Sequence, residues 1–407
     1  MRVRALVAFA PAALLAAAPL VGAGPRGETR SALTDPWREV EAFYKSALGR
    51  HHIQGSSLLV VQGNKVAHRA VHGLQDRDLA KPVTEDTIFH WASITKTFTG
   101  IAILQLRDRG LLSLDDPVVK YLPELRQVRN PFGDMSQVRL RHLMSHSAGF
   151  RAPTWPWSEG KDWEPFEPPR YEQLQAMLPY TELLFAPGSR FSYSNPGVVF
   201  LGRTIEVLTN EDYEVYVDKN VLRPLGMYRS FYDKTPPHLL RHRSHSYFYD
   251  AKGLREARFD FDSGVTVSNG GLNAPLGDMA LYLAFLLGDP EKQGSYDEIL
   301  KRSSLEEMWR PQVTVPDEGG ARVSLGLSYF LESRFGLDLV AHSGTQNGFL
   351  SHFFAHVPSR TAYIVAYNTQ AGGEEANEPA PDGASTRRLD AELRDYLIPR
   401  IFPGASR

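Results

Sequence analysis

Short hydrophobic runs separated by turn residues occur near both ends of the chain. Residues 57–62 and 65–71 are rich in β-branched side chains and flank Gly63-Asn64, a two-residue link suited to a β-hairpin. Similar apolar runs return late in the chain, over residues 323–332, 337–342, 350–356 and 361–368. The pattern predicts antiparallel strands contributed by two distant parts of the sequence.

A helical period of hydrophobic positions marks other segments. Residues 35–48 start with Pro36, which suits a first helical turn, and they place their apolar side chains on one face. Residues 386–401 repeat this amphipathic pattern. Between them, residues 94–109 are apolar nearly all round and are followed by Gly110, a helix stop. The last pattern predicts a helix buried at the centre of the molecule.

The order of these elements predicts an α/β fold of the α+β type. We expect an antiparallel sheet flanked by the N- and C-terminal helices, together with a mostly helical lobe. The sheet domain is expected to be discontinuous, built from residues 35–92 and 265–402, and the helical domain to span residues 93–264. Within the helical domain, residues 203–208 and 212–221 carry the clearest helical patterns.

The amino end of the chain has the pattern of an export signal. Two early arginines precede an apolar run over residues 5–21, which ends in the small-x-small sequence Val21-Gly22-Ala23. Residues 1–23 are therefore interpreted as a signal peptide, which predicts a periplasmic or extracellular protein. An uncleaved membrane anchor is the alternative, but the run contains Pro11 and Pro19 and is shorter than the ~20 residues that a span needs.

Composition excludes several classes of partner and chemistry. Lys and Arg total 45 against 47 for Asp and Glu, so the formal charge of -2 gives no polycationic surface for nucleic acid. The chain has no cysteine, which excludes disulfides, thiolate metal sites and a cysteine nucleophile. Without disulfides, stability must come from a packed core. Since 42% of the 407 residues are hydrophobic, that core can be sizeable. No oligomeric state follows from the sequence.

Ser93 and Lys96 form the first candidate chemical element, at the start of the predicted buried helix. Residues three apart share a helical face, so the lysine amine can reach the serine hydroxyl and take its proton. The N-terminal end of the helix adds N–H groups that could stabilise an oxyanion. The same spacing recurs at Ser158 and Lys161 in a loop that contains a glycine. Ser93 as a helix cap beside an unrelated lysine remains an alternative at this point.

Two further elements lie downstream. In Tyr193-Ser194-Asn195, the phenol could relay a proton with a lysine, and the amide of Asn195 could hold a substrate carbonyl or the lysine. In His342-Ser343-Gly344-Thr345, a strand edge could donate a backbone N–H to an oxyanion, Gly344 permits close approach, and His342 supplies a donor or partial cation. Taken singly, the tyrosine fits a packed aromatic and the histidine a structural residue equally well.

The three elements in this order resemble those of the class C beta-lactamase-like serine hydrolases, which include beta-lactamases, penicillin-binding proteins, D-alanyl-D-alanine carboxypeptidases, D-aminopeptidases and esterases. The resemblance covers roughly residues 40–370. It is supported by five non-catalytic stretches, Leu112–Pro117, Tyr121–Pro123, His142–Gly149, Leu222–Met227 and Gly270–Leu272 ahead of Asp278. It implies a beta-lactamase/transpeptidase-like fold.

The resemblance also implies roles for single residues. Ser93 would be the nucleophile that forms an acyl-enzyme, and Lys96 and Tyr193 the pair that relays its proton. Asn195 would contact the substrate and the lysine, and the N–H groups of Ser93 and Thr345 would form the oxyanion hole. The implied reaction acts on a small-molecule or peptide substrate and needs no metal or organic cofactor.

One position departs from the family pattern. His342 falls where beta-lactamases and penicillin-binding proteins usually have the lysine of Lys-Thr-Gly. A lysine is a permanent cation that can pair with a substrate carboxylate, whereas histidine near pH 7 is mostly neutral. Efficient beta-lactam hydrolysis is therefore in doubt. Since His-x-Gly is more typical of the esterase- and peptidase-like branches, we expect ester or D-amino-acid peptide substrates.

Two other functions compete with this prediction. Ser145–Gly149 imitates the nucleophile elbow of the α/β-hydrolases, with Ser147 as nucleophile, but an elbow follows a buried strand and residues 138–145 have a helical pattern. A catalytically inactive relative that binds peptidoglycan fragments or a partner protein is the second alternative. All expected catalytic residue types are present, which favours an enzyme.

Two further groups of side chains, one of histidines and one of tryptophans, are candidates for a functional role. His238, His242 and His245, as well as His142 and His146, are spaced like metal ligands, yet no carboxylate completes a recognisable metalloenzyme pattern. Residues 154–168 hold three of the six tryptophans, Trp155, Trp157 and Trp163. Our hypothesis is that this loop overhangs the active site and contacts an apolar acyl group.

Overall fold

The computed structural model describes residues 35–152, 170–316, 321–373 and 379–406. Both the predicted signal peptide and the tryptophan-rich loop lie outside these ranges. Residues 36–407 form one compact unit. In the described part of the chain, no helix combines the length and the apolar character needed to cross a bilayer. The division of this unit into a sheet domain and a helical domain stays a prediction.

The main sheet unites strands from both ends of the chain. Across the described residues its order is β3-β2-β1-β14-β13-β12-β11-β10-β9, with every neighbouring pair antiparallel. Early β1 and late β14 pair directly, with Leu59 opposite Ile364. The strands are β1 (Gly55–Gln62), β2 (Lys65–Asp76), β3 (Lys81–Pro82), β9 (Val313–Thr314), β10 (Arg322–Leu325), β11 (Phe330–Arg334), β12 (Leu337–Gln346), β13 (Phe349–His356) and β14 (Thr361–Tyr367). The predicted α/β fold is confirmed.

The sheet confirms one predicted turn and corrects one predicted strand. Gly63 and Asn64 both have positive φ, as a tight two-residue hairpin link requires. Residues 323–332 are not a single strand, because the chain turns between β10 and β11 with Gly326 N–H bonded to the Tyr329 carbonyl at 2.9 Å. A Cβ on Gly326 would lie 2.1 Å from the Met308 carbonyl, so close packing places a glycine in this apolar run.

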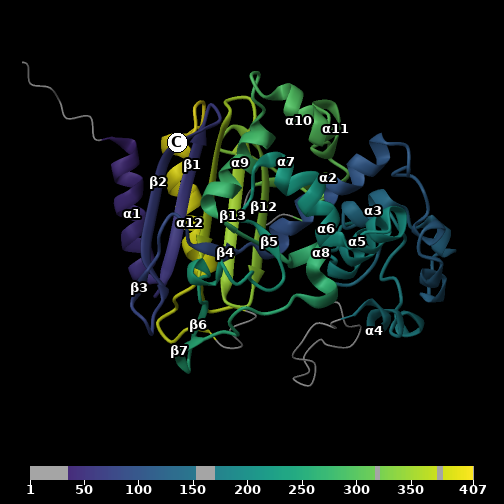
Figure 1. Cartoon of the computed structure of the whole chain (residues 1–407), viewed down its shortest axis with the longest axis horizontal. Helices are drawn as coiled ribbons and strands as arrows, with labels where there is room; N and C mark the ends of the chain where they lie inside the picture. Colours follow the sequence, from purple (N-terminus) through teal and green to yellow (C-terminus); the bar gives the residue numbers. More distant parts are fainter. Residues whose placement is uncertain (1–34, 153–169, 317–320, 374–378, 407) are drawn as a thin grey trace, which may run out of the picture. The chain divides into compact units, whose positions relative to one another are not determined.

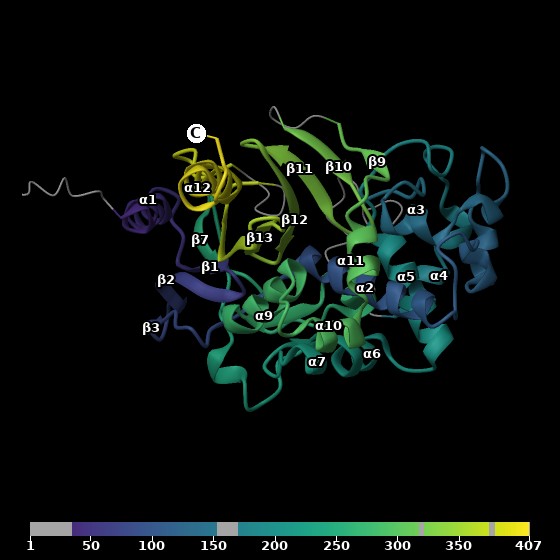
Figure 2. The ribbon, with the colours of Figure 1, turned by 90° about the horizontal axis from the view of Figure 1, so that it is seen from above.

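Helices cover both faces of the sheet (Figures 1 and 2). On one face, α1 (Pro36–Arg50) and α12 (Thr386–Ile401) pack Tyr44 and Leu393 against Leu58 of β1. On the other face, α9 (Leu276–Leu287) and α2 (Thr95–Asp108) bury the alternate side chains, among them Leu59. Because strand side chains alternate between faces, β1 is buried on both sides.

Other helices surround the central helix α2. Those that pack against it are α5 (Asn195–Thr209), α6 (Tyr213–Val217), α8 (Val267–Gly270) and α11 (Arg302–Met308), and α3 (Leu140–Met144) packs against α5. The remaining short helices are α4 (Tyr171–Gln175), α7 (Arg223–Leu225) and α10 (Gln293–Ile299). Residues 212–221, predicted as one helix, are α6 followed by the π-helical turn Asp218–Leu222. Two small sheets pair β4 (Ile88–His90), β8 (Leu272–Pro275) and β5 (Phe231–Tyr232), and β15 (Thr369–Ala371), β6 (Tyr247–Asp250) and β7 (Gly253–Glu256). The buried central helix predicted from the sequence is confirmed, since α2 is buried from its first residue to Leu106.

Candidate active site

Ser93 lies where a strand passes into the central helix. Strand β4 leads into the single 3₁₀ turn Ala92–Ile94, and α2 follows. Ala92 has a φ of 46°, an uncommon conformation for alanine, which bends the chain sharply before Ser93. The adjacent Trp91 is fully buried, and its indole N–H donates to the Ala274 carbonyl at 2.9 Å. The turn is therefore anchored, while Ser93 itself remains only partly buried.

Lys96 lies one helical turn after Ser93 and reaches its hydroxyl. The lysine is 1% exposed, and its Nζ atom donates to Ser93 Oγ at 2.9 Å and to the backbone carbonyl of Asn269 at 2.8 Å. Asn269 belongs to α8, which packs against α2. The distance between Nζ and Oγ is within the range over which a side chain can exchange a proton with a reacting hydroxyl. The fold therefore joins the two residues that the sequence pattern paired.

Tyr193 brings a phenol to the same place from the loop before α5. Its ring centroid lies 5.0 Å from Lys96 Nζ. Burial raises the pKa of the Tyr193 phenol, and a hydrogen bond with the Ser93 side chain opposes this shift. The phenol therefore keeps its proton at neutral pH. Ser93 and Lys96, at the start of α2, thus meet Tyr193, which comes from the loop before α5.

Strand β12 lies directly against the turn that carries Ser93. A Cβ atom on Gly344 would lie 3.0 Å from the Ser93 backbone nitrogen and 2.1 Å from the Trp91 carbonyl oxygen, so only glycine fits. The hydroxyl of Ser351, which is opposite Gly344 on β13, also donates to that carbonyl, at 3.3 Å. Thr345 follows on the same strand. The part of Thr345 in an oxyanion hole stays a prediction.

His342 is buried and neutral: one ring nitrogen donates within the protein, and the surroundings do not favour the partial cation considered from the sequence. The ring is 2% exposed, and Nδ1 lies 2.7 Å from the Ser343 carbonyl. A carbonyl can only accept, so Nδ1 carries the ring proton, and Nε2 is left as a buried lone pair without a hydrogen-bond partner in the described structure. Burial, followed by the charge of Lys96, lowers the pKa of His342 to about 3.

The remaining predicted residue, Asn195, is the first residue of α5. Its backbone N–H donates to the Ala152 carbonyl at 3.2 Å. Its side-chain Oδ1 is buried without a hydrogen-bond partner in the described structure. The contact expected between this amide and Lys96 stays a prediction. Asn195 thus offers an unsatisfied acceptor at the start of α5.

Sequence reasoning missed two residues of the site. Asn269 acts through its main-chain carbonyl, which gives no side-chain signal. His146 packs against the ring of Tyr193 with centroids 4.3 Å apart. It was considered only as a metal ligand and as part of the serine elbow. The available signal was its place inside the stretch His142–Gly149, which supported the family resemblance.

His90, another buried histidine, links the end of β4, just before the turn that carries Ser93, to the end of β12. Its Nδ1 and Nε2 atoms lie 3.0 Å from Asn273 Oδ1 and 2.9 Å from Gln346 Oε1. Burial, and then the nearby Arg243, lowers the pKa of His90 to about 4, so the ring is neutral at pH 7. The contact fixes β12 two residues beyond Gly344.

The competing sequence interpretations are not supported by the fold. Ser147 follows the helix α3 rather than a strand, is buried, and shares a hydrogen bond of 2.9 Å with Ser145 Oγ. Among residues 35–152, 170–316, 321–373 and 379–406, no three His, Asp or Glu side chains are arranged to hold a metal ion. His245 instead pairs with the Glu256 carboxylate at 2.6 Å.

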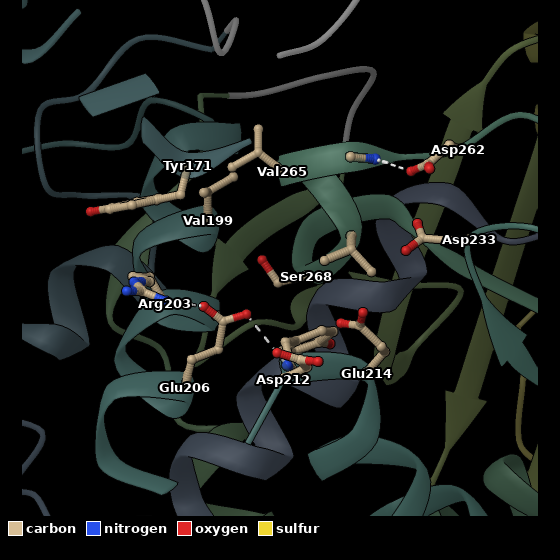
Figure 3. A pocket seen from close by; sticks show the side chains of 14 residues that line it. Tyr171, Val199, Arg203, Glu206, Asp212, Glu214, Asp233, Asp262, Val265 and Ser268 are labelled. Atoms are coloured by element: carbon tan, nitrogen blue, oxygen red, sulfur yellow. Dashed lines mark hydrogen bonds and ion pairs between the residues drawn. The ribbon is translucent and has the colours of Figure 1, made fainter. Parts of the chain in front are cut away.

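A separate acidic pocket of about 250 Å³ lies beside α5 and α8. Glu214, Asp233 and Asp262 stand along one side of it, and Tyr171 and Arg203 on the other (Figure 3). Burial, reinforced by the charges of Asp262 and Glu214, raises the pKa of Asp233 to about 7. None of the predicted catalytic residues lines this pocket.

Comparison with protein families and curated proteins places these features in context. A family model described as Beta-lactamase matches residues 40–387. Esterase EstB from Burkholderia gladioli is 33% identical over 202 residues, which are 46% of this chain and 49% of that protein. The match therefore spans about half the length of that relative.

Solved structures share the fold. The octameric penicillin-binding protein homologue from Pyrococcus abyssi has a TM-score of 0.72 and 27% identity, covering 89% of this chain and 79% of that one. A class C beta-lactamase has a TM-score of 0.69 at 18% identity, covering 91% and 97%. At that identity the second likeness concerns the fold alone. The predicted resemblance is confirmed at the level of family and fold.

Proposed function

The chain belongs to the Beta-lactamase family, and from that premise we propose that it is a serine hydrolase that cleaves an ester or amide through an acyl-enzyme on Ser93. The observation that carries the proposal is the distance of 2.9 Å between Lys96 Nζ and Ser93 Oγ, with the Tyr193 phenol beside both. The esterase relative supports a hydrolytic reaction. Export to the periplasm or the cell exterior, inferred from residues 1–23, is part of the proposal.

In the proposed first step, Lys96 reacts as the neutral amine. Ser93 Oγ attacks the acyl carbon while its proton passes to Lys96 Nζ, 2.9 Å away, because a phenol that keeps its own proton cannot serve as the base. The phenol then gives its proton to the leaving group and regains one from Lys96. The products of this half-reaction are the released alcohol or amine and an ester between the acyl group and Ser93.

Water completes the cycle by the reverse route. It adds to the acyl carbon, loses a proton to the relay formed by Lys96 and Tyr193, and releases the acid as the proton returns to Ser93 Oγ. During both steps the negative oxygen of the tetrahedral intermediate would lie between the N–H groups of Ser93 and Thr345. The close approach of Gly344 to the Ser93 turn supports this placement.

The state of His342 bears on the substrate. A neutral imidazole with a free Nε2 lone pair accepts a hydrogen bond and cannot neutralise a carboxylate. Substrates without a carboxylate next to the scissile bond are therefore favoured, which supports neutral esters over beta-lactams. D-amino-acid peptides remain within the proposal where their carboxylate lies farther from this histidine.

A labelling experiment tests the proposal. The intact protein is treated with a fluorophosphonate and with a fluorescent penicillin, and the modified peptide is located by mass spectrometry. We expect the fluorophosphonate on Ser93, no label in Ser93→Ala, and full labelling in the matched control Ser147→Ala. A label on Ser147 would transfer the reaction to the serine elbow. An absence of any label would favour the binding role of an inactive relative.

A further inference from the structure

His146 holds the segment that carries Tyr193 at three points. Its backbone carbonyl accepts the Ser192 N–H at 2.8 Å, and its ring atom Nδ1 accepts the Ser194 N–H at 3.1 Å. Between these two bonds, the imidazole packs on the phenol ring, with centroids 4.3 Å apart and planes inclined by 34°. The residues on both sides of Tyr193 and the ring of Tyr193 itself are therefore all in contact with one histidine.

The chemistry of these contacts fixes the orientation of the imidazole. Burial lowers the pKa of His146 well below its usual range, and the charge of Lys96 adds to this shift. A neutral imidazole carries one proton, and Nδ1 accepts a backbone N–H, so the proton is on Nε2. Turning the ring over would put the Cδ2–H group against the Ser194 N–H, and moving the proton to Nδ1 would set two N–H groups against each other. One tautomer and one orientation therefore fit this position.

The backbone at His146 has a conformation that histidine rarely adopts. Its φ is 50°, in the left-handed region that favours glycine and asparagine. The turn follows the end of α3 and is held by the Ser147 N–H, which donates to the His142 carbonyl at 2.8 Å. Together with the His146 N–H, which donates to the Leu143 carbonyl at 3.3 Å, this bond closes α3 in a Schellman motif, which holds the backbone of His146 in place.

Tyr193 needs such support because its own segment lacks regular structure. The residue precedes α5, which begins at Asn195, and it belongs to no strand. Ser194 caps that helix by accepting the Gly197 N–H at 3.1 Å, which fixes the residue after the tyrosine but does not contact the tyrosine ring. In the described structure, the contact that faces the phenol ring within this loop region is the imidazole of His146.

From these contacts we propose that His146 is a positioning residue, which acts through the Tyr193 hydroxyl and does not touch the substrate. The inference rests on the proposed function, since it assigns His146 to the proton relay of that same site. A displacement of about 1 Å in a reacting group can lower a rate about 100-fold, and this sets the scale of the expected effect. The acceptor at Nδ1, rather than the bulk of the ring, is the group that the proposal requires.

The first test separates the acceptor from the packing. His146→Phe keeps an aromatic ring but removes Nδ1, and we expect about a 100-fold lower kcat for a neutral ester with KM changed by less than about threefold. His146→Asn tolerates the left-handed backbone and offers Oδ1 in place of Nδ1, so we expect a kcat within about tenfold of the parent protein. His142→Phe, in the helix α3 that precedes this turn, is the matched control with an expected change below about threefold.

The second test asks whether the effect passes through the phenol. Fluorophosphonate acylation rates of Ser93 are measured for the parent protein, His146→Phe, Tyr193→Phe and the double variant. If His146 acts through the Tyr193 hydroxyl, adding His146→Phe to Tyr193→Phe lowers the rate by less than about threefold. If the rate losses of the two single variants multiply in the double variant, the proposal is overturned. An equal loss of kcat in His146→Asn and His146→Phe also overturns it. A parent protein without label on Ser93 overturns the proposed function as well, whereas normal labelling with multiplied losses overturns the positioning role alone.

Discussion

Gly344 approaches Trp91 so closely that a Cβ atom on the glycine would lie 2.1 Å from the tryptophan carbonyl oxygen. This contact joins the middle of β12 to the turn that presents Ser93. Trp91 is in turn fully buried and bonded to β8 through its indole N–H. The distance between the serine and the strand is therefore set by two rigid backbones, and side-chain motion cannot relax it.

A methyl group at Gly344 should separate these two backbones. Gly344→Ala is expected to lower kcat by ~100-fold or more while the protein still folds, because the β12 backbone must shift away from Ser93. Steady-state kinetics on a neutral ester measure the effect. The matched control is Gly277→Ala in the first turn of α9, where a Cβ would meet no atom within 4 Å, so its rate should be unchanged. Equal kinetics for both variants would contradict the role assigned to this contact.

Removing the base should stop acylation without disturbing the serine. For Lys96→Met, we expect a loss of ~10²–10⁴-fold in the rate of Ser93 labelling, the range typical of general-base removal. The side chain is 1% exposed, so an apolar replacement of similar length avoids burying a second polar group. Lys161→Met in the second Ser-x-x-Lys sequence is the control, with no expected change. Retention of labelling in Lys96→Met would transfer the role of base to another group.

The sequence alone was enough to find those candidate site residues that have distinctive side chains. Ser93, Lys96 and Tyr193 could be paired because a hydroxyl, an amine and a phenol recur in a recognisable order. Asn269 could not be found, since it contributes a carbonyl that every residue carries. His146 was visible as a histidine, but its role depends on two backbone N–H groups that only the folded loop brings to it.

The fold was predictable to a similar extent. The hairpin at Gly63-Asn64 and the buried helix α2 follow from local patterns that tertiary contacts leave intact. The turn between β10 and β11 could not be predicted, because it occurs within an apolar run. Its cause is the approach of Gly326 to the Met308 carbonyl, a contact between segments that hydrophobic periodicity does not relate.

The pH dependence of catalysis should not follow His342. Its pKa is lowered to about 3, so the ring is neutral throughout the range from pH 5 to 8, and its charge would appear only as the pH falls toward 3. We expect the kcat/KM profile of His342→Gln to keep the shape of the parent profile between pH 5 and 8, even if its height changes. An inflection near pH 6.5 that disappears in His342→Gln would show that this histidine titrates during turnover.

A substrate that carries a carboxylate provides a second test of His342. His342→Lys places a cation where the neutral ring accepts, so we expect faster acylation by a carboxylate-bearing penicillin relative to a neutral ester. The ratio of the two acylation rates should rise by ~10-fold, the size of one charge-assisted hydrogen bond. An unchanged ratio would show that the substrate carboxylate lies away from this position.

The raised pKa of Asp233 predicts how the stability of the protein depends on pH. Its pKa is raised to about 7 by burial and by the charges of Asp262 and Glu214, whereas an unfolded aspartate titrates near its ordinary value of 3.8. Between these two values the folded protein holds a proton that the unfolded chain releases, so this group's contribution to stability falls as pH rises toward 7. Above that pH the full cost of an ionised carboxylate in the acidic pocket is present.

Asp233→Asn removes this cost, because the amide cannot ionise and its oxygen can still accept the Ser263 N–H. With allowance for partial solvent screening, we expect the variant to be more stable than the parent by ~1–3 kcal/mol at pH 8 and by much less at pH 5. Urea unfolding at both pH values measures the difference. Asp262→Asn removes one of the neighbouring charges and should give a smaller gain of the same sign. A gain for Asp233→Asn that is equal at pH 5 and pH 8 would contradict the shifted titration, because only the ionised carboxylate is penalised by the pocket.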